Sequence, residues 1–190
     1  MQRHQGYELL ERIGSLLRAE LRKSGAEYGL QPAHLQALGF FAQANRYSNT
    51  PAALTEYLGV TKGTASQTLL VLENLGLVKK TEDICDRRVV RVELTRRGRS
   101  ILAALAPPEL WGATCAKLGK RDLDDLAGRL EQVLRVMQQV NGTRTFGVCR
   151  TCRHFLSEGA SKFRCGLTRE PLKAEESLKI CREHEAAPAA

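Results

Sequence analysis

Apolar residues recur three or four positions apart in several segments of the first 142 residues. In 7–23 the repeated Leu and Ile positions fall on one broad face, which predicts an amphipathic helix. The same period predicts a long last helix, 122–140, which ends at Asn141 and Gly142. By this pattern and by start and stop residues, helices are expected at 7–23, 32–44, 51–58, 61–75, 95–106 and 122–140.

Two of these helices are joined by a very short turn. Pro51 suits a first helical turn, Gly59 suits the left-handed residue after a helix, and Thr61 can cap the next helix, which runs to Leu75. Two helices connected in this way are typical of a helix-turn-helix motif.

The hydrophobic period then changes from helical to two. Val90, Val92 and Leu94 alternate with other residues, which predicts a half-buried strand paired with the segment that starts at Leu77. A hairpin in this place, 78–95, would be a wing. The fold class expected is therefore mainly α with a small β-hairpin (α+β), a winged helix-turn-helix.

The helix 61–75 has one apolar and one polar face. Ala65, Leu69 and Leu72 would seat it on the protein, whereas the opposite side is small and polar in its first half. A helix in the major groove reads base edges with such residues, although the same pattern also fits an ordinary solvated helix face. The residues of this helix expected to contact DNA are Thr61, Lys62, Gly63, Thr64, Ser66 and Gln67.

The predicted hairpin carries Arg87 and Arg88 behind Asp86 at its tip. A turn needs no pair of guanidinium groups, whereas the negative potential of a DNA minor groove attracts arginine. Lys79 and Lys80 would add phosphate contacts where the first strand begins. The wing therefore favours DNA binding over the solvated-face interpretation.

The run LTEYLGVTKGTASQTLLVLENLGLVKK, followed by DRRVVRVELTRRG, resembles the winged helix-turn-helix of MarR-type transcription regulators. The resemblance covers about residues 7–142. It implies a homodimer with intertwined terminal helices, a palindromic operator, and a wing at each half-site. It further implies that Asp86 and Arg88 form an ion pair that shapes the wing, while Arg87 or Arg88 enters the minor groove. The chain departs from the family at Val71, often basic there, and at the Pro107–Pro108 pair, which interrupts a helix.

The resemblance also implies a small-molecule effector between the dimer stem and the DNA-binding lobe, which no residue here identifies. The apolar stripes of the first and last helices independently favour a dimer, because a domain of this size cannot cover both by itself. A second possible cover is the C-terminal segment. A dimer that occludes a promoter needs no further contacts, so we expect a repressor.

Charge and hydropathy agree with a cytoplasmic nucleic-acid partner. Lys and Arg number 29 against 21 Asp and Glu, a formal net charge of +8. No apolar run is long enough to span a membrane, and the N-terminus lacks a secretion signal, so we expect a cytoplasmic protein with no membrane partner.

Residues 143–190 differ from the preceding domain, 1–142, because they hold four of the six cysteines. Cys149, Cys152, Cys165 and Cys181 are spaced C-x2-C-x12-C-x15-C, and cytosolic thiols in such a cluster more often bind metal than form disulfides. The segment has too few apolar residues to fold without such a centre. We expect one metal centre bound by the four cysteines.

Zinc is the favoured metal, and an iron-sulfur cluster is the alternative because the last two cysteines are widely separated. His154 and His184 lie beside ligands and are possible substitutes. Of the remaining cysteines, Cys115 is expected to be a small buried side chain and Cys85 an exposed, incidental thiol on the wing.

The sequence contains no nucleophile-base constellation, no phosphate-binding glycine loop and no open metal site, so we expect no enzyme. The alternative function is a metal- or redox-sensing interaction protein whose winged helix contacts protein rather than DNA.

Overall fold

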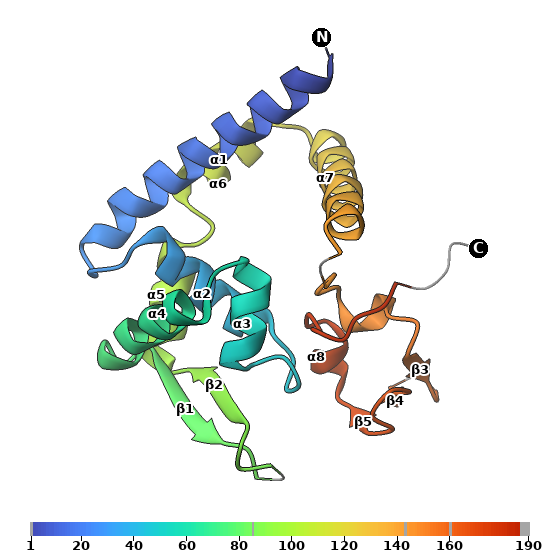
Figure 1. The fold of residues 1–190 in the computed structure, drawn as a ribbon. Coiled ribbons are helices and arrows are strands. Elements are labelled where there is room, and N and C mark those ends of the chain that lie inside the picture. Colours follow the sequence, from blue (N-terminus) through green and yellow to red (C-terminus); the bar gives the residue numbers. More distant parts are fainter. Residues whose placement is uncertain (1, 85, 143, 160, 187–190) are drawn as a thin grey trace.

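The computed structural model describes residues 2–84, 86–142, 144–159 and 161–186, with the side chains of residues 2 and 3 also left aside. Most described residues before 143 are helical, and one two-stranded hairpin lies among the helices (Figure 1). In chain order the elements are α1 (Gln2–Ala26), α2 (Pro32–Gln43), α3 (Pro51–Leu58), α4 (Lys62–Asn74), β1 (Val78–Glu82), β2 (Val90–Leu94), α5 (Arg96–Leu105), α6 (Glu109–Lys117), α7 (Lys120–Val140), η1 (Cys149–Thr151), β3 (Phe155–Ser157), β4 (Phe163–Cys165), β5 (Pro171–Leu172) and α8 (Ala174–Ser177).

Short polar side chains begin the helices where the sequence predicts. The Thr61 hydroxyl accepts a hydrogen bond from the Thr64 amide at 3.2 Å, and Thr95 accepts one from Gly98 at 3.0 Å. Gly59 ends α3 in the left-handed conformation, with φ 63°. These caps satisfy backbone groups that a helix leaves unpaired, so α3 and α4 meet through a fixed turn.

The predicted wing is an antiparallel pair of β1 and β2, in which Val78 faces Leu94 and Glu82 faces Val90. Its base is held from two sides. The Val92 amide donates to the Asn49 carbonyl at 2.8 Å, and α5 starts against the carbonyl of Leu77. A Cβ at Gly98 would lie 2.0 Å from that oxygen, so only glycine permits this approach.

One hydrophobic core joins α2, α3, α4, the wing and α5. Leu38, Leu54, Leu72 and Val92 have no exposed surface, and Phe40 is 1% exposed. Burying side chains of this size stabilises a fold by roughly 1.5–3 kcal/mol each. The orientation of α4 and the wing is therefore fixed by the same packed centre.

The C-terminal segment forms a small module beside α3, whose strands are ordered β3-β4-β5 (Figure 1). It is attached to the loop between α2 and α3 by backbone pairing. The Asn45 amide donates to the Ile180 carbonyl at 3.0 Å, and the Ile180 amide donates to the Gln43 carbonyl at 2.9 Å. The module is therefore a docked part of the winged-helix body rather than a loose extension.

Phe146 extends the main core into this module. Its ring lies 6.0 Å from Phe40 and 5.3 Å from Tyr57, both in edge-to-face arrangements, and the residue is 7% exposed. Edge-to-face aromatic pairs contribute roughly 0.5–1.5 kcal/mol beyond their buried area. The sequence did not identify Phe146 as a core residue because it lies in an otherwise polar linker.

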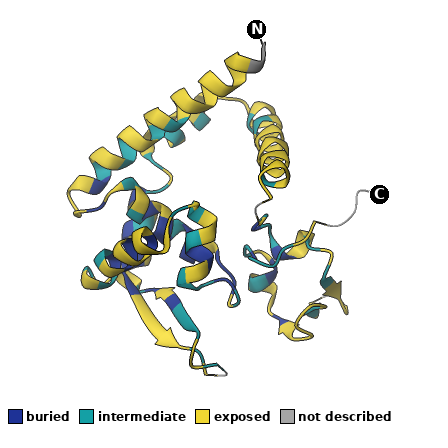
Figure 2. Cartoon of the chain, viewed as in Figure 1, coloured by how far each residue is buried: buried dark blue, intermediate teal, exposed yellow. Residues whose placement is uncertain are grey.

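The helices α1 and α7 are largely exposed in the single chain (Figure 2). Leu9 of α1 and Leu134 of α7 are both 55% exposed, and Met137 is 62% exposed. The C-terminal segment packs on the loop between α2 and α3, so it leaves the apolar face of α1 uncovered. The apolar stripe of α1 could be covered by a partner subunit or by the C-terminal segment, and in this structure the C-terminal segment does not cover it.

Several sequence expectations need adjustment. α1 is longer at both ends than 7–23, and α6, which was not predicted, follows Pro108. Cys115 was expected to be buried but is half-buried, because α6 has no buried residue. Cys85 lies outside the described residues. No helix among the described residues is both long and apolar enough to cross a lipid bilayer.

Removing the Phe146 ring should detach the module from the body. We expect Phe146→Ala to lower the free energy of unfolding by about 3 kcal/mol, the usual cost of a buried Phe-to-Ala change. Leu156→Ala, at a side chain 45% exposed, is the control and should cost under about 1 kcal/mol. Urea denaturation measures both, and equal small losses would show that Phe146 does not join the two parts.

Candidate nucleic-acid interface and four-cysteine pocket

The two faces of α4 divide as the sequence predicts. Ala65, Leu69 and Leu72 are buried, with Thr68 also on this side. The residues expected to contact DNA are all exposed, and these are Thr61, Lys62, Gly63, Thr64, Ser66 and Gln67. The structure therefore presents one continuous polar surface along the first half of a well-seated helix.

The N-terminus of α4 has the properties of a phosphate-binding end. Thr61 and Thr64 lie close together, with their hydroxyl oxygens 3.0 Å apart, and both are exposed. The exposed Lys62 begins the helix, whose free amides and dipole favour an anion there. This end could hold a backbone phosphate while Ser66 and Gln67, farther along, reach base edges.

The ion pair expected at the wing tip is present. Arg88 binds Asp86 in a fork, with Nε 3.0 Å from Oδ1 and Nη2 3.0 Å from Oδ2. The Arg88 side chain and backbone amide lower the pKa of Asp86. The pair shapes the turn, since Oδ1 of Asp86 also accepts the Arg88 amide at 3.1 Å.

This pairing separates the roles of the wing cations. Arg87 is exposed, and among the described residues none forms an ion pair or hydrogen bond with its side chain. Lys79 lies 3.0 Å from Glu93, and Lys80 lies 2.7 Å from Glu73, so each has an acidic neighbour. Arg87 is therefore the wing cation best placed to reach an external anion.

A second ion pair, which the sequence did not reveal, supports the wing where its two strands lead into the tip. Arg91 Nε lies 2.7 Å from Asp83 Oδ2, and both side chains are about one-fifth exposed. Arg91 Nη1 also lies 3.4 Å from Asn49 Oδ1. The wing is thus braced against the loop that precedes α3, and its tip can hold a fixed position relative to α4.

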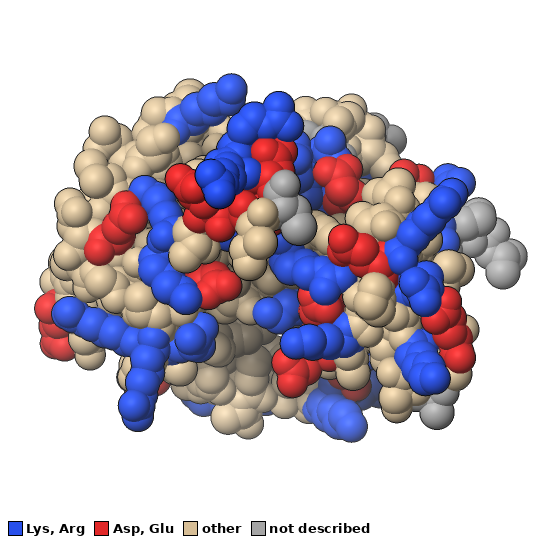
Figure 3. Space-filling model, turned by 90° about the horizontal axis from the view of Figure 1, so that it is seen from below, with Lys and Arg blue, Asp and Glu red and all other residues tan. Residues whose placement is uncertain are grey.

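Positive charge is spread over the face that includes the wing. Seen from below, Lys and Arg side chains are spread across the face, with Asp and Glu side chains among them (Figure 3). Such a surface attracts a polyanion at long range, and the attraction weakens as salt is added.

A cavity of about 770 Å³ lies between α7, which with α1 forms the exposed helical stem, and the winged helix. Its walls come from α2, α3, α7 and the linker after α7, and they include Tyr57, Leu134 and Phe146. Glu56 and Arg144, an ion pair at 3.2 Å, also line it. The mixture of aromatic walls and a few polar groups is typical of a site for a small organic ligand.

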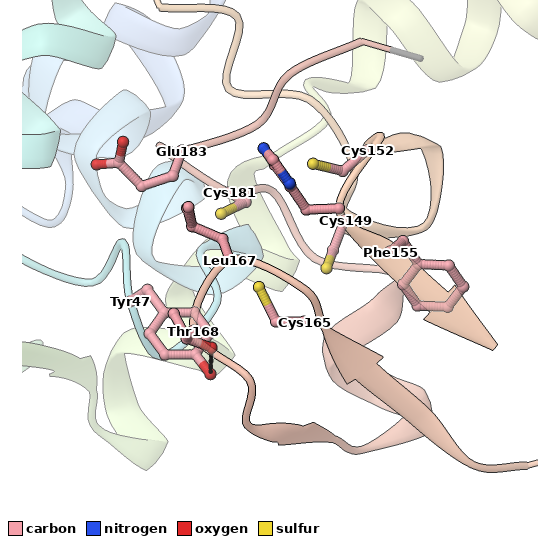
Figure 4. A pocket seen from close by; sticks show the side chains of 10 residues that line it. Tyr47, Cys149, Cys152, Phe155, Cys165, Leu167, Thr168, Cys181 and Glu183 are labelled. Carbon is pink, nitrogen blue, oxygen red and sulfur yellow. Dashed lines mark hydrogen bonds between the residues drawn. The ribbon is translucent and has the colours of Figure 1, made fainter. Parts of the chain in front are cut away.

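The four cysteines expected to bind metal line one cavity of about 150 Å³ (Figure 4). Cys149 begins η1, Cys152 comes directly after it, Cys165 ends β4, and Cys181 follows α8. Separate parts of the module thus bring together residues up to 32 positions apart in sequence, counted as 181 minus 149. Tyr47, from the loop between α2 and α3, completes one wall.

The pKa values of the two buried cysteines of the pocket are raised. Burial, together with Cys181 and the other cysteines of the pocket, raises the pKa of Cys149 to about 12. Burial also raises the pKa of Cys181, while the nearby side chains of Asn45 and Ser48 and the Glu183 backbone act in the opposite direction. Without a cation, thiolates would be unfavourable in such a setting.

The two histidines differ in their relation to the pocket. His154 lines it, and its buried Nε2 has no hydrogen-bond partner among the described residues, although Glu185 Oε1 lies 3.3 Å away. His184 lies outside this pocket, with Nδ1 2.8 Å from the Thr145 hydroxyl and Nε2 3.0 Å from the Thr151 hydroxyl. His184 is therefore engaged elsewhere and is a poor candidate ligand.

Among the described residues, the structure does not by itself show a metal site. Within the part of the chain that the structure describes, no three His, Cys, Asp or Glu side chains form a group that could hold one metal ion. The cysteines nevertheless share one cavity. Their convergence agrees with the sequence prediction, whereas the metal itself stays a prediction.

Residues 28–89, which run from α2 to the wing, match the model of the MarR family. The transcriptional repressor MprA of Escherichia coli K12 is 26% identical over 142 residues, which cover 72% of this chain and 76% of MprA. The region from α2 to the wing is therefore similar in sequence to the MarR family.

Solved structures with the same fold include two complexes. The Staphylococcus aureus MepR–DNA complex matches with a TM-score of 0.57 at 18% identity, over 68% of this chain and 96% of MepR. CouR from Rhodococcus jostii RHA1, bound to p-coumaroyl-CoA, matches with a TM-score of 0.57 at 19% identity, over 66% of this chain and 88% of CouR. At these identities the likeness establishes the fold.

The cap of α4 can be tested without DNA. We expect Thr61→Ala to lower the free energy of unfolding by about 1 kcal/mol, because the Thr64 amide loses its acceptor. Thr61→Ser retains the hydroxyl and should cost little. Thermal denaturation followed by circular dichroism compares the two, and an unchanged midpoint in the alanine variant would contradict the capping role.

Proposed function

We propose that this chain, whose winged helix is of the MarR type, is a DNA-binding transcription regulator that acts as a homodimeric repressor. In each subunit α4 enters the major groove of one operator half-site, and the wing reaches the adjacent minor groove. The observation that carries this proposal is the position of Arg87. It is exposed at the tip of a wing braced by two ion pairs, and the first half of α4 presents its polar residues to solvent in the same domain.

The division of labour between the two elements follows from their chemistry. Gln67 can make a bidentate contact with adenine, and Ser66 and Thr64 can reach bases or phosphates. A guanidinium in the minor groove responds to groove width and negative potential rather than to a unique base pattern. The helix would therefore recognise most of the base sequence, and Arg87 would respond mainly to the width and potential of the minor groove.

The exposed apolar stem supports a homodimer. Leu9, Ile13 and Leu16 of α1 are each about half exposed, and α7 has a similar row. A monomer in water rarely retains so large an apolar stripe, and a twofold partner would bury both stripes with the same surfaces. Two identical reading heads would then require a palindromic operator.

A small-molecule effector is proposed for the cavity between the stem and the winged helix. Tyr57 and Phe146 provide aromatic walls, and the Glu56–Arg144 ion pair provides the polar groups. CouR, which shares the fold, is bound to p-coumaroyl-CoA. A ligand between α3 and α7 would alter the spacing of the two reading heads, and this is how it would release DNA.

Removing the Arg87 guanidinium should weaken DNA binding without affecting folding. We expect Arg87→Ala to reduce affinity about tenfold, from the roughly 1–3 kcal/mol of one groove contact. The probe is a duplex selected from a random pool by the wild-type protein. Binding is measured by fluorescence anisotropy at fixed salt.

The charge-matched control for this test is Arg121→Ala. Arg121 is exposed in the first turn of α7, far from the wing (Figure 1). It should retain affinity within about twofold, since distant exposed charges are screened. Equal losses in both variants, or none in Arg87→Ala, would refute the role of the wing tip.

Charges in the stem should separate the subunits. We expect Leu9→Glu with Ile13→Glu to give a monomer, because four carboxylates would meet in the twofold interface. Sedimentation equilibrium measures the mass. The control is Leu156→Glu with Leu178→Glu, at exposed apolar positions of the C-terminal module. A dimer that survives the stem substitutions would place the interface elsewhere.

A further inference from the structure

We propose that Cys149, Cys152, Cys165 and Cys181 bind an iron-sulfur cluster, and that Cys181 connects this cluster to the loop between α2 and α3 of the winged helix. The choice of a cluster over zinc comes from the size of the space that the cysteines enclose. The role of the loop deepens the proposed function and rests on it.

A single zinc ion draws its ligands close together. Four sulfurs at about 2.3 Å from one ion lie roughly 3.8 Å from one another. The described residues contain no group with an arrangement that could hold one ion, yet the four cysteines line a common cavity of about 150 Å³. A cluster fits this combination, because iron and bridging sulfide occupy the centre and the four thiolates lie outside them.

Polar atoms around the pocket suit a sulfur-rich anion. Asn45 is 1% exposed and its side chain lies beside Cys181, with no other partner for its Nδ2 among the described residues. The Glu185 amide donates to Cys152 Sγ at 3.5 Å. Hydrogen bonds to cluster sulfur are a recognised means of setting cluster stability and potential.

The walls of the pocket bury two of its four cysteines and leave the other two half-buried. Cys149 is 5% exposed and Cys181 is 9% exposed. Phe155 lines the cavity and packs against Phe163 with ring centroids 5.2 Å apart. Such a shell slows the loss of a cluster to water and oxygen, whereas a structural zinc ion needs no comparable space.

A continuous series of contacts runs from Cys181 to the wing. Ser48 lies beside Cys181 and accepts the amide of Arg182 at 2.8 Å. In the same loop, the Asn49 carbonyl accepts the Val92 amide at 2.8 Å, and the Asn49 side chain contacts Arg91. Arg91 holds Asp83, which lies just beyond the last strand pair of the wing.

The same loop also leads into α3. Thr50 caps that helix through the Ala53 amide at 3.2 Å, and Arg182 binds Glu56 on it at 2.8 Å. A cluster that holds Cys181 in place would therefore restrain both the helix-turn-helix and the wing. The loaded form should bind DNA more tightly than the form without cluster.

The first measurement concerns the cluster alone. The full chain is purified without oxygen and supplied with ferrous iron and sulfide. We expect iron and acid-labile sulfide in equal amounts, with a broad visible absorption. Cys165→Ser should lose most of this iron, and Cys115→Ser, at a free thiol in α6, should retain it.

In a parallel experiment the same protein is supplied with zinc instead of iron and sulfide. One tightly held zinc per chain with no sulfide uptake would overturn the cluster, and so would the absence of any metal. Cys165→Ser that is folded by circular dichroism but retains full iron would remove that residue from the site.

The second measurement compares DNA binding by loaded and unloaded protein on the selected duplex. We expect at least about a fivefold difference, the lower end of ordinary coupling between sites. Asn49→Ala should reduce the difference while iron content stays unchanged. Equal affinities of the two forms would overturn the connection through the loop. If neither form binds DNA but the cluster assembles, the proposed function fails and the cluster assignment stands.

Discussion

The loop between α2 and α3 is hydrogen-bonded on both sides. The position of the wing and that of the C-terminal module both depend on this loop. On one side the Asn49 carbonyl extends the wing by accepting the Val92 amide. On the other side the Asn45 amide donates to Ile180 of the C-terminal segment. A short stretch of backbone is thereby paired with two parts of the chain that are far apart in sequence. Because buried backbone groups must be paired, neither neighbour can move away without cost.

This shared loop explains why the arginines of the wing have separate tasks. Arg91 forms an ion pair with Asp83 where the strands end and also contacts Asn49, and Arg88 forms an ion pair with Asp86 at the tip. Both pairs set the shape of the hairpin and leave Arg87 directed to the exterior. Exposed ion pairs contribute little stability, so their value here is positional. A minor-groove contact requires a guanidinium that arrives in a defined place, and the braced hairpin supplies it.

The sequence was sufficient to predict the winged helix because its local patterns agree with the packing. Thr61, Gly59 and Thr95 are capping residues that fix the helix ends, and the alternation around Val92 fixes the strand. The Asp86–Arg88 pair was also predictable, but only through the resemblance to a family. The four cysteines were predicted as metal ligands from their spacing alone, and the structure places them around one pocket, while metal binding stays a prediction.

Other features depended on contacts between distant residues and had no local pattern. Phe146 lies in a polar linker, yet it packs on Phe40 in the main core. From the alternation of the strand, Arg91 is expected to point to solvent, but its side chain contacts Asp83 and Asn49. α6 was missed because its nine residues, Glu109–Lys117, have no buried side chain to create a period. The preference between zinc and a cluster depends on the size of the pocket, which spacing does not determine.

The central claim is that this positively charged winged helix binds duplex DNA, and the salt dependence of affinity tests it most directly. Affinity for the selected duplex is measured by anisotropy over a range of salt concentrations. Several phosphate contacts should make the logarithm of the binding constant fall linearly with the logarithm of salt concentration, with a slope of about −0.9 for each contact. A slope near zero, or no binding at low salt, would contradict the account and favour a protein partner for the winged helix.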